Sequence, residues 1–194
     1  MKTISLLGCG KLGFPLAIEL LKKGYIIKGS TTTRTKIKDL KKMDIIPYLI
    51  NLGNDIPSDF INADILVLTL PFKKSFSGPL EYKKQVQIVC ERIKDSCIQH
   101  IVFTSSSSVY PKDSRIFSVS DNFEPPNLRA KVLLECEKTL NRLENISVIT
   151  IRLGGIYGSG RLIKKSTKLR RLVSHKDALK HIENSLDRFG ENYC

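Results

Sequence analysis

Three glycines near the amino terminus have the spacing of a phosphate-binding turn. Gly8, Gly10 and Gly13 form the pattern Gly-x-Gly-x-x-Gly between a short apolar run at 3–7 and an amphipathic segment at 12–23. In such a turn the first glycine permits the tight bend, the second lets a pyrophosphate approach the backbone, and the third lets the helix pack on the strand. The N–H groups and dipole of the following helix would then face the phosphates. The pattern predicts a dinucleotide at this turn.

The end of the second expected strand bears on which dinucleotide binds. The sequence there reads Gly-Ser-Thr-Thr-Thr-Arg over 29–34 and offers no carboxylate for a free ribose 2′-hydroxyl. The hydroxyls of Thr31 and Thr32 with Arg34, and Lys36 behind it, suit a 2′-phosphate, because a guanidinium forms paired charge-assisted bonds to it. The alternative is that Arg34 only caps or solvates the next helix. The pattern favours NADP over NAD and leaves both open.

The elements that would carry these residues alternate between short apolar and longer amphipathic segments. Strands are predicted at 3–7, 25–29, 48–52, 64–70, 98–105 and 147–152, and helices at 12–23, 35–42, 80–95, 128–143 and 176–189. Segment 112–126 is expected to be an ordered loop, and segment 154–174 to be irregular. The alternation, in a chain of 194 residues, predicts a single α/β domain with a Rossmann-type, doubly wound, mostly parallel sheet.

Composition narrows the class of protein further. No segment approaches the roughly 20 apolar residues needed to cross a bilayer, and no signal-peptide pattern opens the chain, so we expect a cytoplasmic protein without a membrane partner. The formal charge of +13 favours anionic ligands. Nucleic acid is the weaker interpretation, because the basic residues are not interleaved with aromatic ones.

Five scattered cysteines indicate reduced thiols. Their number is odd, they form no Cys-x-x-Cys pair, and no histidine lies near them at zinc-ligand spacing. We therefore expect neither a disulfide framework nor a metal site.

Two later segments carry a resemblance to a known family. The run Phe-Thr-Ser-Ser-Ser-Ser-Val-Tyr at 103–110 and the run Arg-Leu-Gly-Gly-Ile-Tyr-Gly-Ser-Gly-Arg at 152–161 resemble elements of the extended, atypical short-chain dehydrogenase/reductases of the NAD-dependent epimerase/dehydratase family. The Gly-Cys-Gly opening and the Leu-Leu-Glu-x-Glu run at 133–137 are similar to its YeeZ-like branch. The resemblance covers residues 1–161 and, weakly, 175–186.

This resemblance implies a set of catalytic residues, with one departure. Family members combine a serine, a tyrosine that transfers a proton, and a lysine that lowers the tyrosine pKa. Ser106 and Lys131 lie at the serine and lysine positions, but the tyrosine position, four residues before the lysine, holds Asn127, whose amide exchanges no proton near neutral pH. Tyr110 and Tyr157 are the remaining tyrosines near the expected site, and Tyr110 is the first alternative proton donor.

The resemblance also implies a cofactor site and a domain plan. The dinucleotide would contact Gly8, Gly10, Lys11, Leu12, Gly13, Thr31, Thr32, Arg34, Asp55, Leu70, Pro71, Ser105, Lys131, Leu153 and Ile156. Residues 1–161 would form the NAD(P)-binding domain, and residues 162–194 a shortened remnant of the substrate region with a C-terminal helix. The segment 174–179 resembles the family's His-x-x-Asp helix start, and the role of the basic stretch 162–173 stays open.

Two functions remain open. The first is an NAD(P)-dependent oxidoreductase or epimerase that acts on a nucleotide sugar or similar anionic polyol. The second is a pseudoenzyme that binds the dinucleotide as a sensor or partner-binding module, which the absent tyrosine favours. A homodimer is compatible with either.

Overall fold

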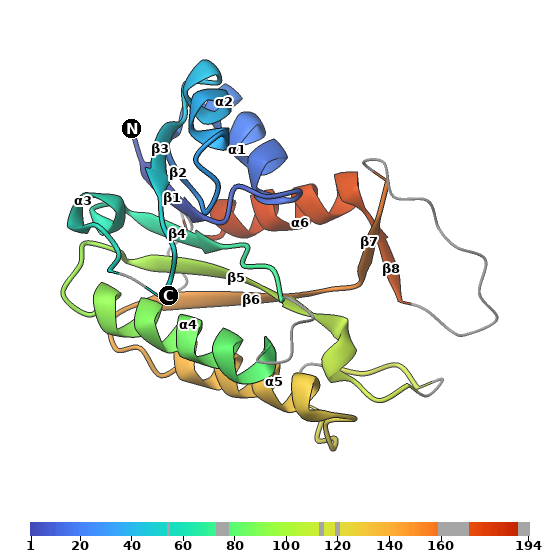
Figure 1. Ribbon diagram of the computed structural model, residues 1–194. Helices are drawn as coiled ribbons and strands as arrows, with labels where there is room; N and C mark the ends of the chain where they lie inside the picture. Colours follow the sequence, from blue (N-terminus) through green and yellow to red (C-terminus); the bar gives the residue numbers. More distant parts are fainter. Residues whose placement is uncertain (54, 73–77, 113–114, 119–120, 159–170, 190–194) are drawn as a thin grey trace.

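Six strands pair in parallel to form the central sheet (Figure 1). The structure is a computed structural model, and it describes residues 1–53, 55–72, 78–112, 115–118, 121–158 and 171–189. In chain order its elements are β1 (Thr3–Leu7), α1 (Gly13–Lys22), β2 (Ile26–Thr31), α2 (Lys36–Lys42), β3 (Ile46–Leu49), α3 (Ser58–Ile61), β4 (Ile65–Leu68), α4 (Gly78–Ile93), β5 (His100–Ser106), a 3-10 turn (Ser107–Val109), α5 (Leu128–Leu140), β6 (Ser147–Leu153), β7 (Gly155–Tyr157), β8 (Leu172–Ser174) and α6 (His175–Asp187).

The strand order of the sheet is β3-β2-β1-β4-β5-β6. The chain starts in the middle, proceeds outward through β2 and β3, and then returns to add β4, β5 and β6 on the other side of β1. The direction of winding therefore reverses between β1 and β4, where Leu7 is paired with Leu68. In open parallel sheets, ligands bind outside the carboxyl ends of the strands at this reversal. The predicted Rossmann-type, doubly wound sheet is confirmed.

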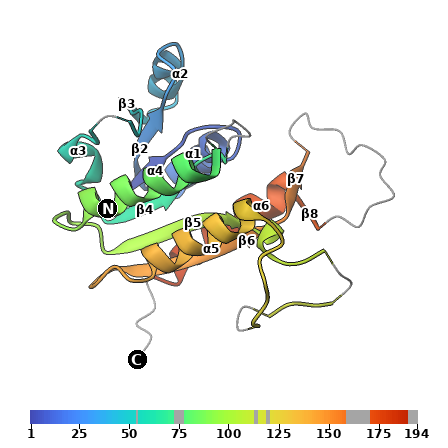
Figure 2. The same cartoon turned by 60° about the horizontal axis from the view of Figure 1, so that its bottom comes forward.

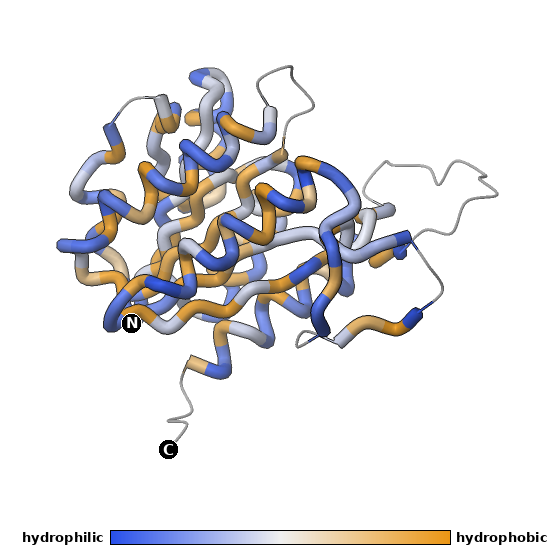
Figure 3. The backbone as a smooth tube through the Cα atoms, turned by 90° about the horizontal axis from the view of Figure 1, so that it is seen from below, coloured by the Kyte–Doolittle hydropathy of each residue, from blue (hydrophilic) through white to orange (hydrophobic). Residues whose placement is uncertain are grey.

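Helices cover both faces of the sheet, because successive residues of a strand point to opposite sides. Leu66 and Phe103 belong to a core cluster that includes buried residues of α4 and α5, whereas Ile65 and Val102 belong to a second cluster with α1 and α6 (Figure 1). Figure 3 shows hydrophobic and hydrophilic residues alternating along the covering helices, as a half-buried helix requires. Since α6 joins the same core, the described part of the C-terminal segment packs as part of this domain.

The positions of the six sheet strands and five longer helices agree with the sequence-based prediction to within a few residues. The largest difference is at β3, which begins at Ile46 although Pro47 reads as a strand breaker. Pro47 is tolerated because β3 lies at the edge of the sheet, where a missing backbone N–H does not interrupt the hydrogen-bond ladder. The short helix α3 and the 3-10 turn were not predicted, because each is too short to show a hydrophobic period.

The prediction that 154–174 is irregular is wrong at both described ends of this segment. Gly155–Tyr157 and Leu172–Ser174 pair in parallel as β7 and β8. A Cβ atom at Gly154 would lie 2.8 Å from the Arg171 carbonyl oxygen, so glycine allows this close approach. Three-residue strands with distant partners leave no periodic signal in the sequence. The basic residues at 161–170 lie outside the described part of the chain.

The segment that joins the 3-10 turn to α5 extends beyond the carboxyl end of β5 (Figure 2). Its described residues form neither helix nor strand, in agreement with the loop expected at 112–126. Within the described ranges, no helix combines the length and apolar character that a membrane span needs.

Candidate functional site

A cleft of about 710 Å³ opens at the carboxyl ends of the parallel strands. Every strand of the six-stranded sheet, or the loop that follows it, contributes to the lining. The lining residues are 7–12, 30–33, 36, 50–52, 69–72, 85, 104–106, 129 and 153–156. The cleft therefore spans the reversal point between β1 and β4, where the fold favours a ligand.

The three glycines of the turn after β1 have distinct surroundings. Gly8 has a φ of +113°, and a Cβ there would lie 2.9 Å from the Thr69 carbonyl oxygen. At Gly13 a Cβ would lie 2.2 Å from the Gly8 carbonyl oxygen and 2.6 Å from the Leu6 side chain. At Gly10 the nearest atom to a Cβ is the Gly8 carbonyl oxygen at 4.0 Å, and Gly10 lines the cleft. Gly8 and Gly13 thus permit the turn itself, whereas Gly10 leaves open space in front of it.

Side chains from the neighbouring strands hold the turn in place. The Gly8 amide donates to Ser30 Oγ at 2.9 Å, and the Cys9 amide donates to the Ser30 carbonyl oxygen at 2.7 Å. On the other side, Thr69 Oγ1 donates to the Gly8 carbonyl oxygen at 2.7 Å. The amides of Lys11 and Leu12 donate to no acceptor in the described part of the chain. These two amides remain available to an anion at the start of α1.

The cleft wall beside β2 carries hydroxyls and one lysine. Thr31 and Thr32 line the cleft as the sequence predicts, and so does Lys36. Arg34 is exposed and does not line it. Asp55 also lies outside the lining, because its carboxylate forms an ion pair with Arg92 at 2.9 Å. The cation that the structure places on this wall is therefore Lys36.

Cys9 lines the cleft from within the glycine turn but does not offer a reactive thiolate. Its side chain is 4% exposed. Burial raises the pKa of the Cys9 thiol to about 12, so the thiol is protonated at neutral pH. A structural role in packing β1 against β2 follows.

At the other end of the cleft, the last residues of β5 lie beside the end of β6 and β7. Ser105 and Ser106 line this end together with Leu153 and Ile156. The Ser106 hydroxyl accepts a hydrogen bond from the Ser108 amide at 3.2 Å, which caps the 3-10 turn. Leu70 and Pro71, after β4, complete the predicted lining. Ser106 thus lies at the end of β5 and lines the cleft.

A buried network lies behind Ser105. The Ser105 hydroxyl donates to the Glu137 carboxylate at 2.6 Å. Arg152 donates to the same carboxylate through Nε and Nη2, the latter at 2.6 Å. Its Nη1 donates to the Tyr110 hydroxyl at 2.7 Å, and Tyr110 stacks on Phe117. Tyr110 does not line the cleft, and its hydroxyl oxygen is occupied by Arg152, so the structure places Tyr110 in this network and not beside Ser106.

The orientation of α5 decides what else reaches the cleft. Asn127 and Lys131 share a helix face, as expected from their spacing, but both are exposed and neither lines the cleft. Asn127 caps the helix, because its side-chain oxygen accepts from the Ala130 amide at 3.0 Å. The opposite face carries Arg129, Leu133 and Glu137. The structure therefore does not bring Lys131 or Asn127 together with Ser106.

The charges that line the cleft have one sign. Among the described lining residues, Lys11, Lys36 and Arg129 are cationic, and no aspartate or glutamate is present. The described lining also contains no histidine and no tyrosine. The cleft thus suits an anionic ligand. The uncharged polar side chains of the described lining are hydroxyls, the amides of Asn51 and Gln85, and the protonated Cys9 thiol.

Of the predicted site residues, eleven cofactor contacts and one catalytic residue line the cleft: Gly8, Gly10, Lys11, Leu12, Thr31, Thr32, Leu70, Pro71, Ser105, Leu153, Ile156 and Ser106. Gly13 permits the turn but does not line the cleft. The predicted residues that also lie outside the lining are Arg34, Asp55, Lys131 and Tyr110. Sequence reasoning missed Ser30, Thr69, Phe72 and Arg129. Ser30 lies near the end of β2 and Thr69 directly follows β4, so their place at the carboxyl ends of the two strands that flank β1 is a signal that the sequence contained. Arg129 gave no such signal.

The C-terminal segment also reaches the glycine turn. His175, at the start of α6, donates from Nε2 to the Lys11 carbonyl oxygen at 2.9 Å. Ser174 caps α6, because its hydroxyl accepts from the Asp177 amide at 3.0 Å. The resemblance of 174–179 to a His-x-x-Asp helix start therefore coincides with a described contact between α6 and the turn.

The chain is similar to known proteins in sequence and in fold. No protein-family model matches the chain. Protein YeeZ from Escherichia coli (strain K12) is 33% identical over 167 residues, which cover 83% of this chain and 61% of YeeZ. The chain therefore spans less than two thirds of the length of this relative.

Solved structures share the fold at low sequence identity. UDP-N-acetylglucosamine 4-epimerase from Methanobrevibacter ruminantium M1, in complex with UDP-N-acetylmuramic acid, superposes with a TM-score of 0.78 at 15% identity, over 96% of this chain and 73% of that chain. UDP-glucuronic acid 4-epimerase from Bacillus cereus, in complex with UDP-glucuronic acid and NAD, gives 0.77 at 16% identity, with the same coverage. The chain is thus similar in sequence to YeeZ, which supports the YeeZ-like branch, and it has the fold of these epimerases.

Proposed function

We propose that the chain binds NAD or NADP in the cleft, with the pyrophosphate at the glycine turn. The observation that carries this proposal is the contrast between Gly10, which leaves open space on the cleft side, and Gly13, which is closed in by the Gly8 carbonyl oxygen and Leu6. The available amides of Lys11 and Leu12 and the cationic lining fit two phosphates. The Bacillus cereus epimerase with the same fold is described in complex with NAD, which supports a dinucleotide as the ligand.

Calorimetric titration with NAD and NADP tests this proposal with a matched pair of variants. Gly10→Val fills the open space and should weaken dinucleotide binding by about 100-fold or more, equivalent to about 2.7 kcal/mol. Gly53→Val is the control, because a Cβ at Gly53 also has its nearest neighbour at 4.0 Å but Gly53 lies outside the cleft lining. Equal affinity of the two folded variants would contradict the proposal, as would the absence of binding to the wild type.

We propose NADP as the preferred dinucleotide, with Lys36 and the hydroxyls of Thr31 and Thr32 around the 2′-phosphate. The support is that Lys36 lines the cleft and that no described carboxylate stands there to bind a free 2′-hydroxyl. Lys36→Met should weaken NADP by about 1 to 3 kcal/mol and leave NAD nearly unchanged. Arg34→Met removes the same charge outside the lining and serves as the control. If Arg34→Met weakens NADP binding more than Lys36→Met does, Arg34 binds the 2′-phosphate, as the sequence pattern predicts.

A second candidate function is turnover of a nucleotide sugar or similar anionic polyol. Ser106 favours it, because this hydroxyl lines the end of the cleft that the nicotinamide of a bound dinucleotide would occupy in this fold. The described lining offers no side chain that exchanges a proton near neutral pH, which favours a dinucleotide-binding protein without turnover. We propose the latter as the function that the geometry supports better.

A cofactor-reduction assay with UDP-glucose and UDP-glucuronic acid separates these two functions. The binding-protein proposal expects the wild type to bind dinucleotide and to show no turnover. Because an epimerase leaves no net reduced cofactor, the sugar products are analysed for epimers as well. Turnover by either measure that disappears in Ser106→Ala and persists in Ser108→Ala would establish the enzyme, because Ser108 is exposed and lies outside the lining. Lys131→Met should not change either result, since Lys131 is exposed on the far side of α5.

A further inference from the structure

Arg129 is the cation at the Ser106 end of the cleft. It lies in the first turn of α5 and lines the cleft with Phe72, Gln85 and Ser106. Its guanidinium carbon lies 4.4 Å from the centre of the Phe72 ring. That ring in turn stacks on Tyr82 with a centroid distance of 4.6 Å, and Tyr82 is buried. The two rings hold the guanidinium in place by cation–π attraction and packing.

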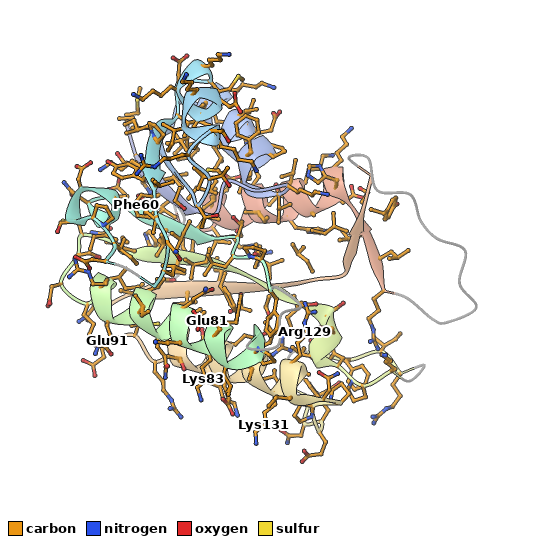
Figure 4. All side chains as sticks on the ribbon, in the orientation of Figure 1. Phe60, Glu81, Lys83, Glu91, Arg129 and Lys131 are labelled. Atoms are coloured by element: carbon orange, nitrogen blue, oxygen red, sulfur yellow. The ribbon has the colours of Figure 1, made fainter. Side chains whose placement is uncertain are left out.

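The guanidinium of Arg129 is not paired with an acid in the described part of the chain. No described residue forms an ion pair or hydrogen bond with it, and its Nε is buried without a partner. Buried donors are normally satisfied, so an unpaired guanidinium at a cleft wall suits a ligand group with two acceptor oxygens. Lys131 cannot play this part, because it does not face the cleft. Residues two positions apart on a helix point about 200° apart, and Lys131 faces outward (Figure 4).

A dinucleotide alone leaves Arg129 without an anionic partner. When the pyrophosphate lies at the glycine turn and the adenosine lies towards β2, the nicotinamide half extends towards β5 and Ser106. The nicotinamide and its ribose carry no further negative charge beyond the pyrophosphate. An anion beside Arg129 therefore has to come from a second molecule that shares the cleft.

We infer that Arg129 binds the carboxylate or phosphate of a second small ligand, which occupies the Ser106 end of the cleft beside the dinucleotide. This inference rests on the proposed dinucleotide function. It assigns the second ligand to the class of small anions and excludes neutral sugars or alcohols. Arg129 is a binding residue here and transfers no proton, since a guanidinium keeps its proton at neutral pH.

The test uses calorimetry on the full chain saturated with NADP. The probes are uridine against UDP, which differ in phosphate, and UDP-glucose against UDP-glucuronic acid, which differ in one carboxylate. We expect the wild type to prefer the more anionic member of at least one pair, and Arg129→Met to remove that preference with a loss of about tenfold or more in affinity. The pair that responds identifies phosphate or carboxylate as the group bound. Arg129→Lys should recover only part of the affinity, because a single ammonium does not match two oxygens.

Lys131→Met is the matched control, since it removes the same charge from the same helix on the outward face. Unchanged probe affinity in this control supports the inference, and a loss equal to that of Arg129→Met overturns it by showing a general charge effect. A loss of NADP affinity in Arg129→Met also overturns it, because Arg129 would then contact the dinucleotide. If the wild type binds NADP but shows no preference for the more anionic probes, the inference about Arg129 is overturned and the proposed function stands. If the wild type binds no dinucleotide, the proposed function is overturned.

Discussion

The two ends of the cleft are built in different ways. The glycine end consists of one contiguous turn, which presents backbone amides and leaves space for a ligand because glycines have no side chains. Ser30 and Thr69 hold this turn in place by hydrogen bonds from the neighbouring strands. The Ser106 end combines segments far apart in the sequence, from the loop after β4 to the buried pair of Glu137 and Arg152. Local sequence therefore determines the first end, whereas the second depends on how α5 is oriented against the sheet.

This difference explains why spacing in the sequence defines the geometry at one end of the cleft and not at the other. At the glycine end, the spacing of three glycines is itself the binding geometry. At the Ser106 end, the predicted contacts Asn127 and Lys131 have the expected mutual spacing, but the helix turns their common face to solvent. The face towards the cleft presents Arg129, with Glu137 two turns further along the helix and buried.

The largest effect is expected from breaking the buried pair behind the Ser106 end. Glu137 is 5% exposed and accepts hydrogen bonds from both Arg152 and Ser105. Glu137→Ala leaves the largely buried Arg152 guanidinium without an acidic partner and should lower the free energy of unfolding by about 3 to 5 kcal/mol. Urea denaturation measures this loss. Glu135→Ala, which removes the exposed partner of Lys83 from the same helix, should leave stability nearly unchanged.

Equal stability of the Glu137→Ala and Glu135→Ala variants would contradict the view that the Ser106 end depends on this tertiary pair.

An intermediate effect is expected at the glycine end, where only the space around each glycine matters. Gly13→Ala places a Cβ 2.2 Å from the Gly8 carbonyl oxygen, so the turn or the helix has to move. We expect a loss of about 1 to 3 kcal/mol in the free energy of unfolding. Gly10→Ala meets no atom closer than 4.0 Å and should retain wild-type stability. A reversed order of the two variants in urea denaturation would refute the geometry of the turn.

A smaller effect is expected at the start of α5, where Asn127 caps the helix. Asn127→Tyr removes the side chain that caps the helix and should lower the free energy of unfolding by about 1 kcal/mol. It should create no turnover, because this position faces away from Ser106. Asn127→Asp keeps the capping oxygen and is the control for stability. Dinucleotide-dependent turnover in Asn127→Tyr would show that the α5 face points into the cleft after all.

The smallest effect is expected where the C-terminal helix meets the glycine turn. His175→Ala removes one partly exposed hydrogen bond to the Lys11 carbonyl oxygen and should lower the free energy of unfolding by about 0.5 kcal/mol. His181→Ala, on the exposed side of the same helix, is the control. Identical melting temperatures of the two variants would mean that the glycine end is independent of α6.

The amino-acid sequence was sufficient to predict the α/β alternation, the order of the main elements and the glycine turn. These features follow from hydrophobic periods and from backbone space, which depend on residues close together in the chain. It also placed Ser106 correctly at the end of β5, because the carboxyl ends of parallel strands meet at one edge of the sheet.

Other features could not be predicted, because they depend on packing between distant parts of the chain. The pairing of β7 with β8, the network of Ser105, Glu137, Arg152 and Tyr110, and the position of Arg129 over Phe72 join residues that are distant in sequence. The rotation of α5 about its axis determines which of its residues enter the cleft, and this rotation is set by packing against the sheet and α4. A shift of two helix positions exchanges a cleft residue for a solvent residue, because each residue turns the helix by about 100°. A spacing pattern constrains the distance between two side chains on a helix but not the direction in which both of them point.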